Sequence, residues 1–497
     1  MPKDLEKRSP DIATMMPYWD EVTAILDGKT AVQEAGEKYL PKFPDESNED
    51  YAFRLKVGKF TNVYRDVVEG LASKPFQDEV ALIQGDSEDA KEIPQFVRDF
   101  VENVDGFGNN LTSFAGLTFF NGINFAIDWI FIDYPNVDNP DTLTVSDAKK
   151  LNLRPYWRHV LGRNVCEVKT AMRGADEIIT YFRYVEPSFG NEPVKVREFV
   201  LTPDNKVEWR LYKKTQTDVP ENQYTLERSG FLSVNFIPMV PFVTGRRDGS
   251  SFKFYPPMQD TADLQITLYQ NESALEYIKI LACYPMLATD GIKAKTGPDG
   301  KPLKIGVGPG RVLYGVPMDN GAGGSWKYVE PNANSLEFLK KDIDKTKTDL
   351  RELGRQPLTA LSSQLTTVTT SIAAGKAKSA VTAWAYALKD ALENALLMTC
   401  RWQGIKDYEP EVNVYTGFDN VTDDGTDLEQ LGQARARGDI SLETYWEELK
   451  RRKVLSPEFN AEREKTRMLN DIPAETAPDM DSGNEANSNL NQERTNK

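Results

Sequence analysis

The sequence predicts an α+β protein built around long helices and a β-rich segment, and three observations lead to this class. Two long helical patterns bracket a glycine-rich segment between residues 256 and 355. A charge-free Ser/Thr stretch follows, and then a third, alanine-rich helical pattern that ends near residue 403. Between residues 123 and 243, β-branched and aromatic residues lie between turn signals. This order, without a catalytic constellation, is typical of a channel wall formed by several copies rather than of an active site.

Length and charge limit the classes of function. A chain of 497 residues exceeds what one core organises, so we expect two to four domains. The formal net charge of -16 excludes a globally basic nucleic-acid-binding surface, although it does not exclude a DNA partner. Three widely separated cysteines predict reduced thiols in a cytosolic setting. The N-terminus and the most apolar window both carry polar interruptions, so we expect a soluble protein with no signal peptide and no membrane partner.

The scarcity of histidine excludes most familiar enzyme mechanisms. His159 is the single histidine, so a histidine-rich metal site is impossible and a catalytic triad would depend on this one residue. Its setting in Tyr156-Trp157-Arg158-His159 favours a packed or surface histidine. Gly28-Lys29-Thr30 resembles the end of a phosphate-binding loop, but Thr23 stands where that loop needs glycine. We therefore expect no enzyme, no cofactor and no metal site.

The first half of the chain divides into a helical part and a β-rich part. Helical spacing of apolar residues predicts helices over residues 51–71, 95–104 and 110–120. Turn signals such as Pro203-Asp204-Asn205 separate the predicted strands. These strands cover residues 123–133, 178–185, 195–201, 207–213 and 231–243.

The two long predicted helices differ in the polarity of their surfaces. The first opens at Pro256-Pro257, ends before Pro285 and is apolar nearly all round, so it requires neighbours on most sides. The second, over residues 331–355, has one thin apolar row in a charged surface, so one flank faces water. Asn334 and Glu337 are spaced as a capping box. Pairs of Glu337 with Lys341 and of Lys345 with Asp349 support this helix locally, each by about 0.2 to 0.5 kcal/mol.

A glycine- and proline-rich segment over residues 286–330 joins these helices. Strand-like pieces at residues 304–307, 311–316 and 326–329 predict a small β module at the end of a helical hairpin. Its basic residues stand out in an acidic chain and suit an acidic partner or phosphates, although solubility alone also explains them. They are Lys293, Lys295, Lys301, Lys304 and Arg311.

The stretch after the second helix carries hydroxyl groups and no charge. Neutral hydroxyls contact a polyanion without releasing its condensed counterions, so a loop of this composition can touch a polyanion without holding it. Most threonine-rich loops are nevertheless ordinary loops, and that interpretation stays open. The residues concerned are Thr359, Ser362, Ser363, Thr366, Thr367, Thr369 and Thr370. A third helix follows, with a core stripe that includes Val381, Leu388 and Ala395. Short helices are expected near the C-terminus, one capped by Ser441 and one over residues 456–469, and the composition beyond Asp471 predicts disorder.

The order of several short motifs gives the chain a resemblance that covers nearly its whole length. These motifs are Glu37-Lys38-Tyr39-Leu40-Pro41, Ser73-Lys74-Pro75-Phe76, Gly122 leading to Asp133-Tyr134-Pro135, Arg154-Pro155-Tyr156-Trp157, Ile237-Pro238, the block 256–291, and the segment 432–470 with Gly438-Asp439-Ile440-Ser441. In this order they resemble the portal proteins, or head-to-tail connectors, of tailed bacteriophages, especially a portal-like branch with an uncharacterised domain. None of the motifs carries chemistry.

The resemblance implies a homo-oligomeric ring, usually of twelve copies, at one vertex of the virion capsid. It implies a wing (1–255 with the long helix 372–403), stem helices (256–283 and 331–355), a clip (284–330), a tunnel loop (356–371), a crown (404–470) and a disordered tail (471–497). Double-stranded DNA would pass through the ring without sequence specificity during packaging and ejection. The implied partners are the terminase large subunit, head-completion or adaptor proteins and the major capsid protein, with assembly in the host cytoplasm.

Lysines of the second helix are the candidates for lining such a channel. Lys340, Lys341, Lys345 and Lys347 would offer screened, transient contacts to DNA, while helical position alone does not decide which of them point inward. Two other classes stay open. One is another virion component, such as a head-tail adaptor or a capsid subunit. The other is a nucleic-acid-processing enzyme, which would require a carboxylate cluster or a phosphate loop.

Overall fold

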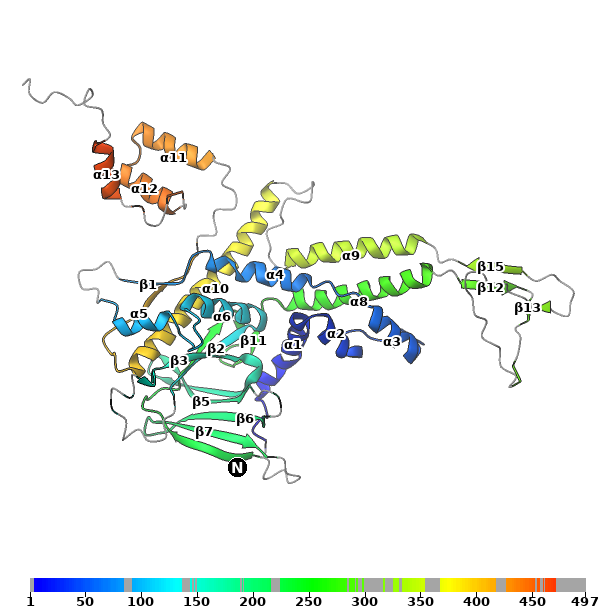
Figure 1. Ribbon diagram of the computed structural model, residues 1–497, viewed down its shortest axis with the longest axis horizontal. Helices are drawn as coiled ribbons and strands as arrows, with labels where there is room; N and C mark the ends of the chain where they lie inside the picture. Colours follow the sequence, from blue (N-terminus) through cyan, green and yellow to red (C-terminus); the bar gives the residue numbers. More distant parts are fainter. Residues whose placement is uncertain are drawn as a thin grey trace, which may run out of the picture. The chain divides into compact units, whose positions relative to one another are not determined.

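The computed structural model divides the chain into two compact units, Met1–Thr416 and Gly417–Lys497, each of which is described by itself (Figure 1). The structure describes residues 4–84, 92–135, 144, 147, 150, 151–187, 190, 192–215, 224–283, 286–290, 292–293, 297–298, 316–317, 325–329, 333–353, 367–416, 426–451, 454–455, 459 and 461–470. Helices and antiparallel sheets both contribute, which confirms the predicted α+β class.

The N-terminal part of the first unit is helical. Its helices are α1 (Pro10–Asp27), α2 (Lys29–Glu34), α3 (Asn48–Val57), α4 (Val63–Ala72), α5 (Gln95–Val101) and α6 (Leu111–Phe125). The single helix predicted over residues 51–71 is wrong, because the chain breaks between α3 and α4. A Cβ atom at Gly58 would lie 2.8 Å from the Ser273 hydroxyl, so the chain passes too close to a neighbouring helix for a side chain there. Asn62 then caps α4 by accepting from the Arg65 amide.

A three-stranded sheet forms the centre of this unit. Its order is β3 (Tyr156–Leu161), β2 (Ile127–Asp133) and β9 (Met239–Val243), all antiparallel. β2 is buried along nearly its whole length because it is covered on both faces. The predicted strand over 123–133 begins too early, since α6 continues to Phe125, and the one predicted over 231–243 covers the end of one strand and all of another.

A five-stranded antiparallel sheet covers one face of the central sheet. It runs in sequence order through β4 (Val165–Arg173), β5 (Asp176–Glu186), β6 (Lys195–Leu201), β7 (Val207–Lys214) and β8 (Tyr224–Phe231). Trp129 of β2 packs edge-on against Phe182 of β5 at 4.8 Å between ring centroids. The strands predicted near β5, β6 and β7 are confirmed, whereas β3, β4 and β8 were not predicted.

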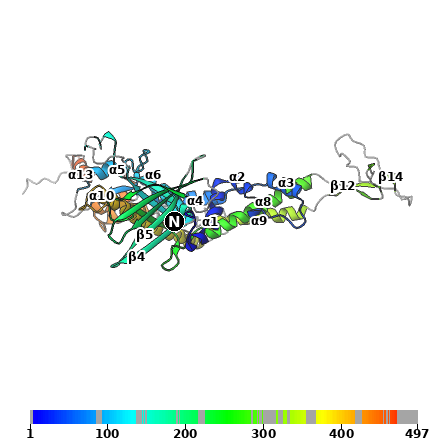
Figure 2. The ribbon, with the colours of Figure 1, turned by 90° about the horizontal axis from the view of Figure 1, so that it is seen from below.

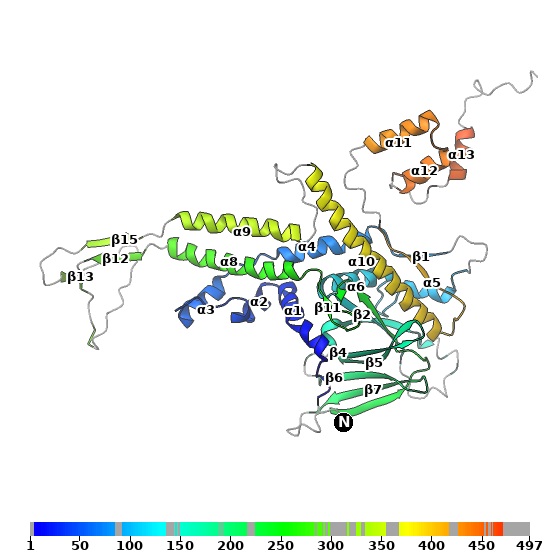
Figure 3. The same cartoon turned by 180° about the vertical axis from the view of Figure 1, so that it is seen from behind.

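Helices α6 and α10 (Thr367–Trp402) cover the other face of the central sheet (Figure 3). The indole nitrogen of buried Trp157 donates to Thr399 Oγ1 of α10 at 2.8 Å. His159 stacks on Phe114 of α6 and places Nδ1 3.1 Å from the buried carboxylate of Asp128. His159 is therefore packed, which is one of the two settings predicted for it, and the predicted core stripe of the third helix is buried at Val381, Leu388 and Ala395.

Two short antiparallel pairs complete the body of this unit, and the second unit is helical. β1 (Ala81–Ile83) pairs with β16 (Glu411–Asn413), and β10 (Arg246–Arg247) pairs with β11 (Phe254–Tyr255). The helices of the second unit are α11 (Thr426–Arg437), α12 (Leu442–Arg451) and α13 (Ala461–Asn470). Ser441 Oγ accepts from the Thr444 amide, which confirms the predicted cap of α12.

Candidate functional site

The two long helices predicted from the sequence form an antiparallel hairpin of α8 (Gln259–Cys283) and α9 (Ala333–Leu353). They lie side by side in Figure 1 and again in Figure 2. Helices α1, α3 and α4 also contact α8, so its side chains are buried around most of the circumference. The prediction that this helix requires neighbours on most sides is confirmed, and within the described residues those neighbours come from its own chain.

Polar side chains buried on α8 bind the loop that leads into α4. Gln265 Oε1 accepts from the amides of Val63 and Tyr64, each at 3.0 Å, and Gln265 Nε2 donates to the Thr61 carbonyl at 2.9 Å. Glu272 accepts from the Thr61 amide at 2.9 Å and from its hydroxyl at 2.8 Å. The hairpin is thereby joined to the helical part of the unit by hydrogen bonds as well as by apolar packing.

Lys347 differs from the other lysines proposed to line a channel. Its Nζ lies 2.9 Å from Glu272 Oε1, and the Lys347 and Glu272 side chains are 24% and 3% exposed. A buried carboxylate with a cation at this distance requires that cation for charge compensation. Lys347 is therefore a cross-brace between α9 and α8, and its charge is already matched within the hairpin.

The other three lysines lie on the exposed face of α9. Lys340, Lys341 and Lys345 are exposed, whereas Ile343 and Leu350 are buried. Lys341 pairs with Glu337 at 3.0 Å, which confirms that predicted pair. The predicted pair of Lys345 with Asp349 is wrong, since no ion pair joins them. In a helix the acid-first order of such a pair is the more favourable one, and only the Glu337 pair has that order.

Other boundaries on this segment also differ from prediction. α9 begins at Ala333, so Asn334 lies in its first turn and is not the cap. α10 begins at Thr367, so Thr367, Thr369 and Thr370 belong to a helix, not to a loop as predicted. Alanines follow closely after these threonines, and a threonine costs a helix only about 0.5 kcal/mol more than alanine, so the helix extends through them. Thr359, Ser362, Ser363 and Thr366 lie outside the described residues.

Short strands lie between the two helices in the chain. β12 (Met286–Asp290) pairs with β15 (Ser325–Val329), and β13 (Ile292–Lys293) pairs with β14 (Val316–Pro317). The strand predicted at 326–329 is confirmed, and β12 was not predicted. Lys293 belongs to β13, while the predicted strand at 304–307 and the basic residues Lys295, Lys301, Lys304 and Arg311 fall outside the described residues. The predicted β module at the end of a helical hairpin is confirmed for the strands described.

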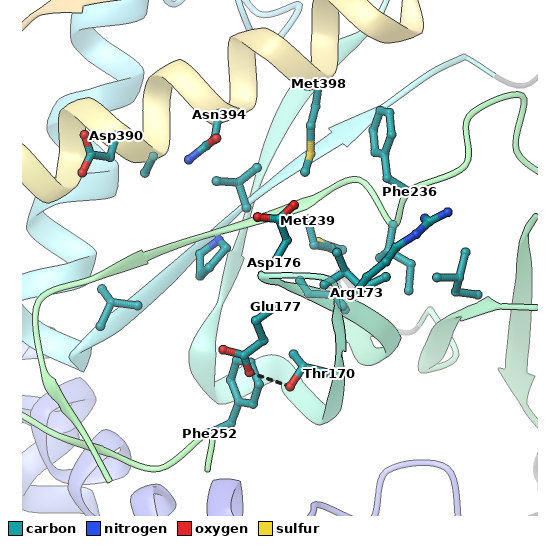
Figure 4. A pocket seen from close by; sticks show the side chains of 18 of the residues that line it. Thr170, Arg173, Asp176, Glu177, Phe236, Met239, Phe252, Asp390, Asn394 and Met398 are labelled. Atoms are coloured by element: carbon teal, nitrogen blue, oxygen red, sulfur yellow. Dashed lines mark hydrogen bonds between the residues drawn. The ribbon is translucent and has the colours of Figure 1, made fainter. Parts of the chain in front are cut away.

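A second feature, a groove of about 850 Å³, lies between α10, β9 and the β4–β5 hairpin (Figure 4). Asp390, Asn394 and Met398 of α10 lie along one wall, and Arg173 and Asp176 lie on the opposite one. Much of the lining is apolar; it includes Ile178, Leu201, Phe236, Met239, Val240 and Phe252. This groove could not be predicted from the sequence, because its residues come from several segments that meet only in the folded chain.

The two cysteines whose side chains are described are not activated as nucleophiles. Burial raises the pKa of the Cys400 thiol to about 11 and also raises the pKa of Cys166, so neither is a thiolate at neutral pH. Among the residues described, no group of three or more His, Cys, Asp and Glu side chains is placed to hold a metal ion. Of the helices described, none is both long and apolar enough to cross a membrane.

A carboxyl pair joins α1 to α8. Glu21 hydrogen-bonds with Asp263, and burial together with that neighbouring carboxylate raises the pKa of Glu21 to about 7. Protonated Glu21 donates to Asp263, whereas ionised Glu21 repels it. Because the folded pKa lies above the ordinary value of 4.5, the free energy of unfolding falls as the pH rises from about 4.5 to about 7.

Replacing Glu21 by glutamine is expected to remove this pH dependence. The amide still donates to Asp263 but carries no charge, so E21Q should be more stable than wild type by roughly 1 to 2 kcal/mol above pH 7, after allowance for solvent screening. Urea denaturation at acidic and alkaline pH measures the difference. Glu34→Gln, at an exposed position on α2, is the matched control. Equal pH profiles for wild type and E21Q would contradict the assignment.

A protein-family model matches the part of the chain that contains the α8–α9 hairpin. Residues 257–403 match the model of a family described as a domain of unknown function, DUF4055. That range runs without interruption from α8 through the short strands and α9 to α10. No curated protein matches the chain. The matched range contains both the α8–α9 hairpin and the α10 wall of the groove.

Several solved structures align over most of the chain. A chain of the neck of a native GTA particle, computed with C12 symmetry, aligns at 12% identity and a TM-score of 0.40 over 87% of this chain and 96% of that chain. A chain of the virion of a native gene transfer agent (GTA) particle aligns at 12% identity and a TM-score of 0.41, covering 85% and 96%. A chain of the neck of an empty GTA particle, computed with C6 symmetry, aligns at 13% identity and a TM-score of 0.41, covering 84% and 96%.

Proposed function

We propose that this protein is a portal protein of a phage-like particle: a ring subunit whose copies enclose the channel through which double-stranded DNA is packaged and ejected. The observation that carries the proposal is the α8–α9 hairpin. One of its helices is covered on most sides, and the other presents a charged outer face, which is the division of roles that a channel wall needs. The order of sequence motifs that resembles portal proteins supports the same assignment.

The outer face of α9 suits a surface along which DNA slides. Lys340, Lys341 and Lys345 are exposed there, and the acidic residues Glu337 and Asp344 lie among them. Tight binding of phosphates requires clustered cations that release many counterions, whereas interspersed acids oppose it. A face of mixed charge therefore contacts the phosphates only transiently, and the net charge of -16 per chain disfavours tight wrapping of DNA.

The chain would act with partners and without its own chemistry. The terminase large subunit would supply the force for packaging and would dock at the clip, for which Lys293, Lys295, Lys301, Lys304 and Arg311 are the candidate contacts. Head-completion or adaptor proteins would replace the terminase after packaging, and the major capsid protein would surround the ring. The Ser/Thr residues of segment 356–371 and the first turn of α10 would face the passing duplex.

Electron microscopy of the purified full-length chain tests the proposal. We expect rings with an axial hole, usually of twelve copies, at micromolar protein concentration. Closed shells would instead identify a capsid subunit, and isolated monomers under all assembly conditions would contradict the proposal. A ring without the α8–α9 hairpin at its lumen would identify an adaptor-like component with a different wall.

Charge reversal on α9 is expected to impair DNA packaging without preventing assembly. Replacing Lys340, Lys341 and Lys345 by glutamate removes three positive charges and adds three negative ones per copy on an exposed face, so the lumen repels DNA. We expect the packaging rate to fall about tenfold at low ionic strength and by less at high ionic strength, because salt screens exposed charges. The triple arginine variant is the matched control and should package normally. Unchanged packaging by the glutamate variant would show that this face does not line the channel.

A further inference from the structure

The loop between α5 and α6 is held rigid by its own side chains. Asn103 Oδ1 accepts from the amides of Gly106 and Gly108, each at 2.9 Å, and Asp105 Oδ1 accepts from the Phe107 amide at 2.8 Å. Asn109 Nδ2 donates to Asp105 Oδ2 at 2.6 Å. These carboxylate and amide oxygens are occupied by N–H groups of the loop, so the loop is a self-contained structural unit.

The side chain of Phe107, which belongs to this rigid loop, is exposed to solvent. Phe107 is 91% exposed and lies between Gly106 and Gly108, whose φ values of +82° and +97° are left-handed conformations that favour glycine. A large, exposed apolar side chain on a rigid loop is typical of an anchor residue at a protein interface. The loop is already ordered before binding, so little conformational entropy is lost when the interface forms. The loop is here named the Phe107 knob, residues 103–109.

The groove beside α10 offers a complementary apolar recess. At one end of it, Met398 of α10, Phe236 and Met239 lie near one another, and Asp390 lies at the other end (Figure 4). Phe236 and Met398 are both half-buried, so they already form part of an apolar wall that remains open to solvent. A phenyl ring seated between them would remove the exposed apolar surface of both partners from water.

The knob and the groove lie at opposite edges of the central sheet. The Trp157 amide of β3 donates to the Val104 carbonyl at 2.8 Å, so the knob continues from the β3 edge. The groove is lined by β9, and the sheet order β3-β2-β9 places β2 between the two. One copy therefore presents a knob on one side and a recess on the other. Such a pair is complementary in a head-to-tail contact between two copies, and repeated head-to-tail contacts close into a ring.

The charges of the two surfaces favour docking of the Phe107 knob at the Met398 end of the groove. Residues 98–109 contain three acidic residues, Asp99, Glu102 and Asp105, and one basic residue, Arg98. Arg154 Nη2 also donates to the Asn103 carbonyl at 2.5 Å, so the base of the knob keeps an excess of one negative charge. Arg401 lines the groove close to Met398 in the helix, is exposed, and has no carboxylate partner among the residues described. Asp390 is eleven positions away along α10, or about 16 Å at 1.5 Å per residue, so it does not oppose docking at the Arg401 end.

We propose that the Phe107 knob of one copy docks between Met398 and Phe236 of the next copy, above buried Met239, with Arg401 facing the acidic base of the knob. The inference rests on the proposed ring and deepens it, because it names one contact between neighbouring subunits. The occupant of the groove is thus a second copy of this chain.

A mixed cysteine experiment tests the contact directly. Full-length F107C and M398C proteins are prepared separately, mixed during assembly and oxidised. We expect a disulfide-linked dimer in the mixture, because only an intermolecular contact brings the two thiols together. Each variant oxidised alone is the matched control and carries the same native cysteines. No dimer beyond that of the controls, in a mixture that forms rings, overturns the inference.

Assembly measurements give an independent readout. F107D should raise the protein concentration needed for half-maximal ring formation by at least about tenfold, since an interface anchor is lost. Phe231→Asp makes the same change at another exposed phenylalanine, at the end of β8, and should shift that concentration less than about twofold. M398K should reproduce the effect of F107D from the groove side. Rings of F107D that form as readily as wild type overturn the inference alone, whereas a wild-type protein that forms no ring contradicts the proposed function.

Discussion

Replacement of Arg54 by alanine is expected to lower the free energy of unfolding by about 3 to 5 kcal/mol, the range for breaking one partner out of a buried ion pair. Arg54 Nε and Nη2 donate to the two carboxylate oxygens of Glu46, each at 2.7 Å, and Nη2 also donates to the Pro41 carbonyl at 2.8 Å. The two side chains are 1% and 4% exposed, so the substitution removes the cation from a carboxylate that lies in a largely buried position. The guanidinium also lies 4.0 Å from the Phe43 ring centroid, a further contact that alanine removes.

We expect the destabilisation by R54A to appear first in α3 and in the part of α8 that α3 contacts. Arg54 belongs to α3, which contacts α8, and its hydrogen bonds hold residues 41–46 against α3. Hydrogen exchange should therefore show faster exchange in α3 and in the adjoining turn of α8 of R54A before the central sheet is affected. Arg98→Ala is the matched control, because its pair with Glu92 is largely exposed and contributes at most about 1 kcal/mol. A loss in R54A no larger than in R98A would show that the buried pair contributes little.

The Arg54–Glu46 pair also predicts that the protein loses stability at acidic pH. The Arg54 guanidinium hydrogen-bonded to Glu46 lowers the pKa of that carboxyl below its ordinary value of 4.5. A lowered folded pKa means that the stabilisation is fully present above the unfolded value and is lost as the pH falls through the folded one. Wild type should thus lose stability below about pH 4.5 through this pair, which is a direction opposite to that of Glu21.

The long elements were predictable because many residues repeat one signal. α8, α9 and α10 carry apolar positions at helical spacing over several turns, and their type was predicted correctly. Short elements carry too few residues for a period to be distinguished. The break between α3 and α4 was missed because the apolar spacing continues across Gly58, whose role depends on the approach of Ser273 from a distant segment. β4 and β8 were missed because their exposed residues lack an alternating pattern.

The candidate site was predictable only in its outline. A charged second helix was expected to offer four lysines, and sequence spacing made them equivalent. The fold distinguishes Lys347, because Glu272 lies opposite it across the helix pair. The Phe107 knob escaped prediction for a different reason: the hydrogen bonds that make it rigid are local, but a lone phenylalanine between glycines has no period. The groove depends wholly on tertiary structure, since β9, α10 and the β4–β5 hairpin are far apart in the sequence.

Replacement of Glu272 by alanine is expected to destabilise the protein by about 3 to 4 kcal/mol, since a charged pair and two hydrogen bonds are lost at a buried position. Glu272 accepts from the amide and the hydroxyl of Thr61 and pairs with Lys347. The alanine variant leaves the Lys347 ammonium without its carboxylate and the Thr61 donors without an acceptor. Glu272→Gln retains an oxygen for Thr61 but not the charge, so its loss should be about half as large. Urea denaturation of the three proteins measures these differences.

The position of Glu272 makes its loss a test of the channel wall as well as of stability. Glu276→Ala, one turn further along α8, is the matched control, because its pair with Lys279 is partly exposed, at 30% and 48%, and contributes at most about 1 kcal/mol. If the proposed ring uses the hairpin as its wall, α9 must stay parallel to α8 while DNA passes, and Glu272 is a cross-brace between them. E272A rings should therefore show faster hydrogen exchange in α9 and slower packaging, whereas E276A rings should match wild type. Equal exchange in α9 of both variants would mean that the buried side chains of α9 suffice to hold the helix; among the residues described these are Ile343, Thr346 and Leu350.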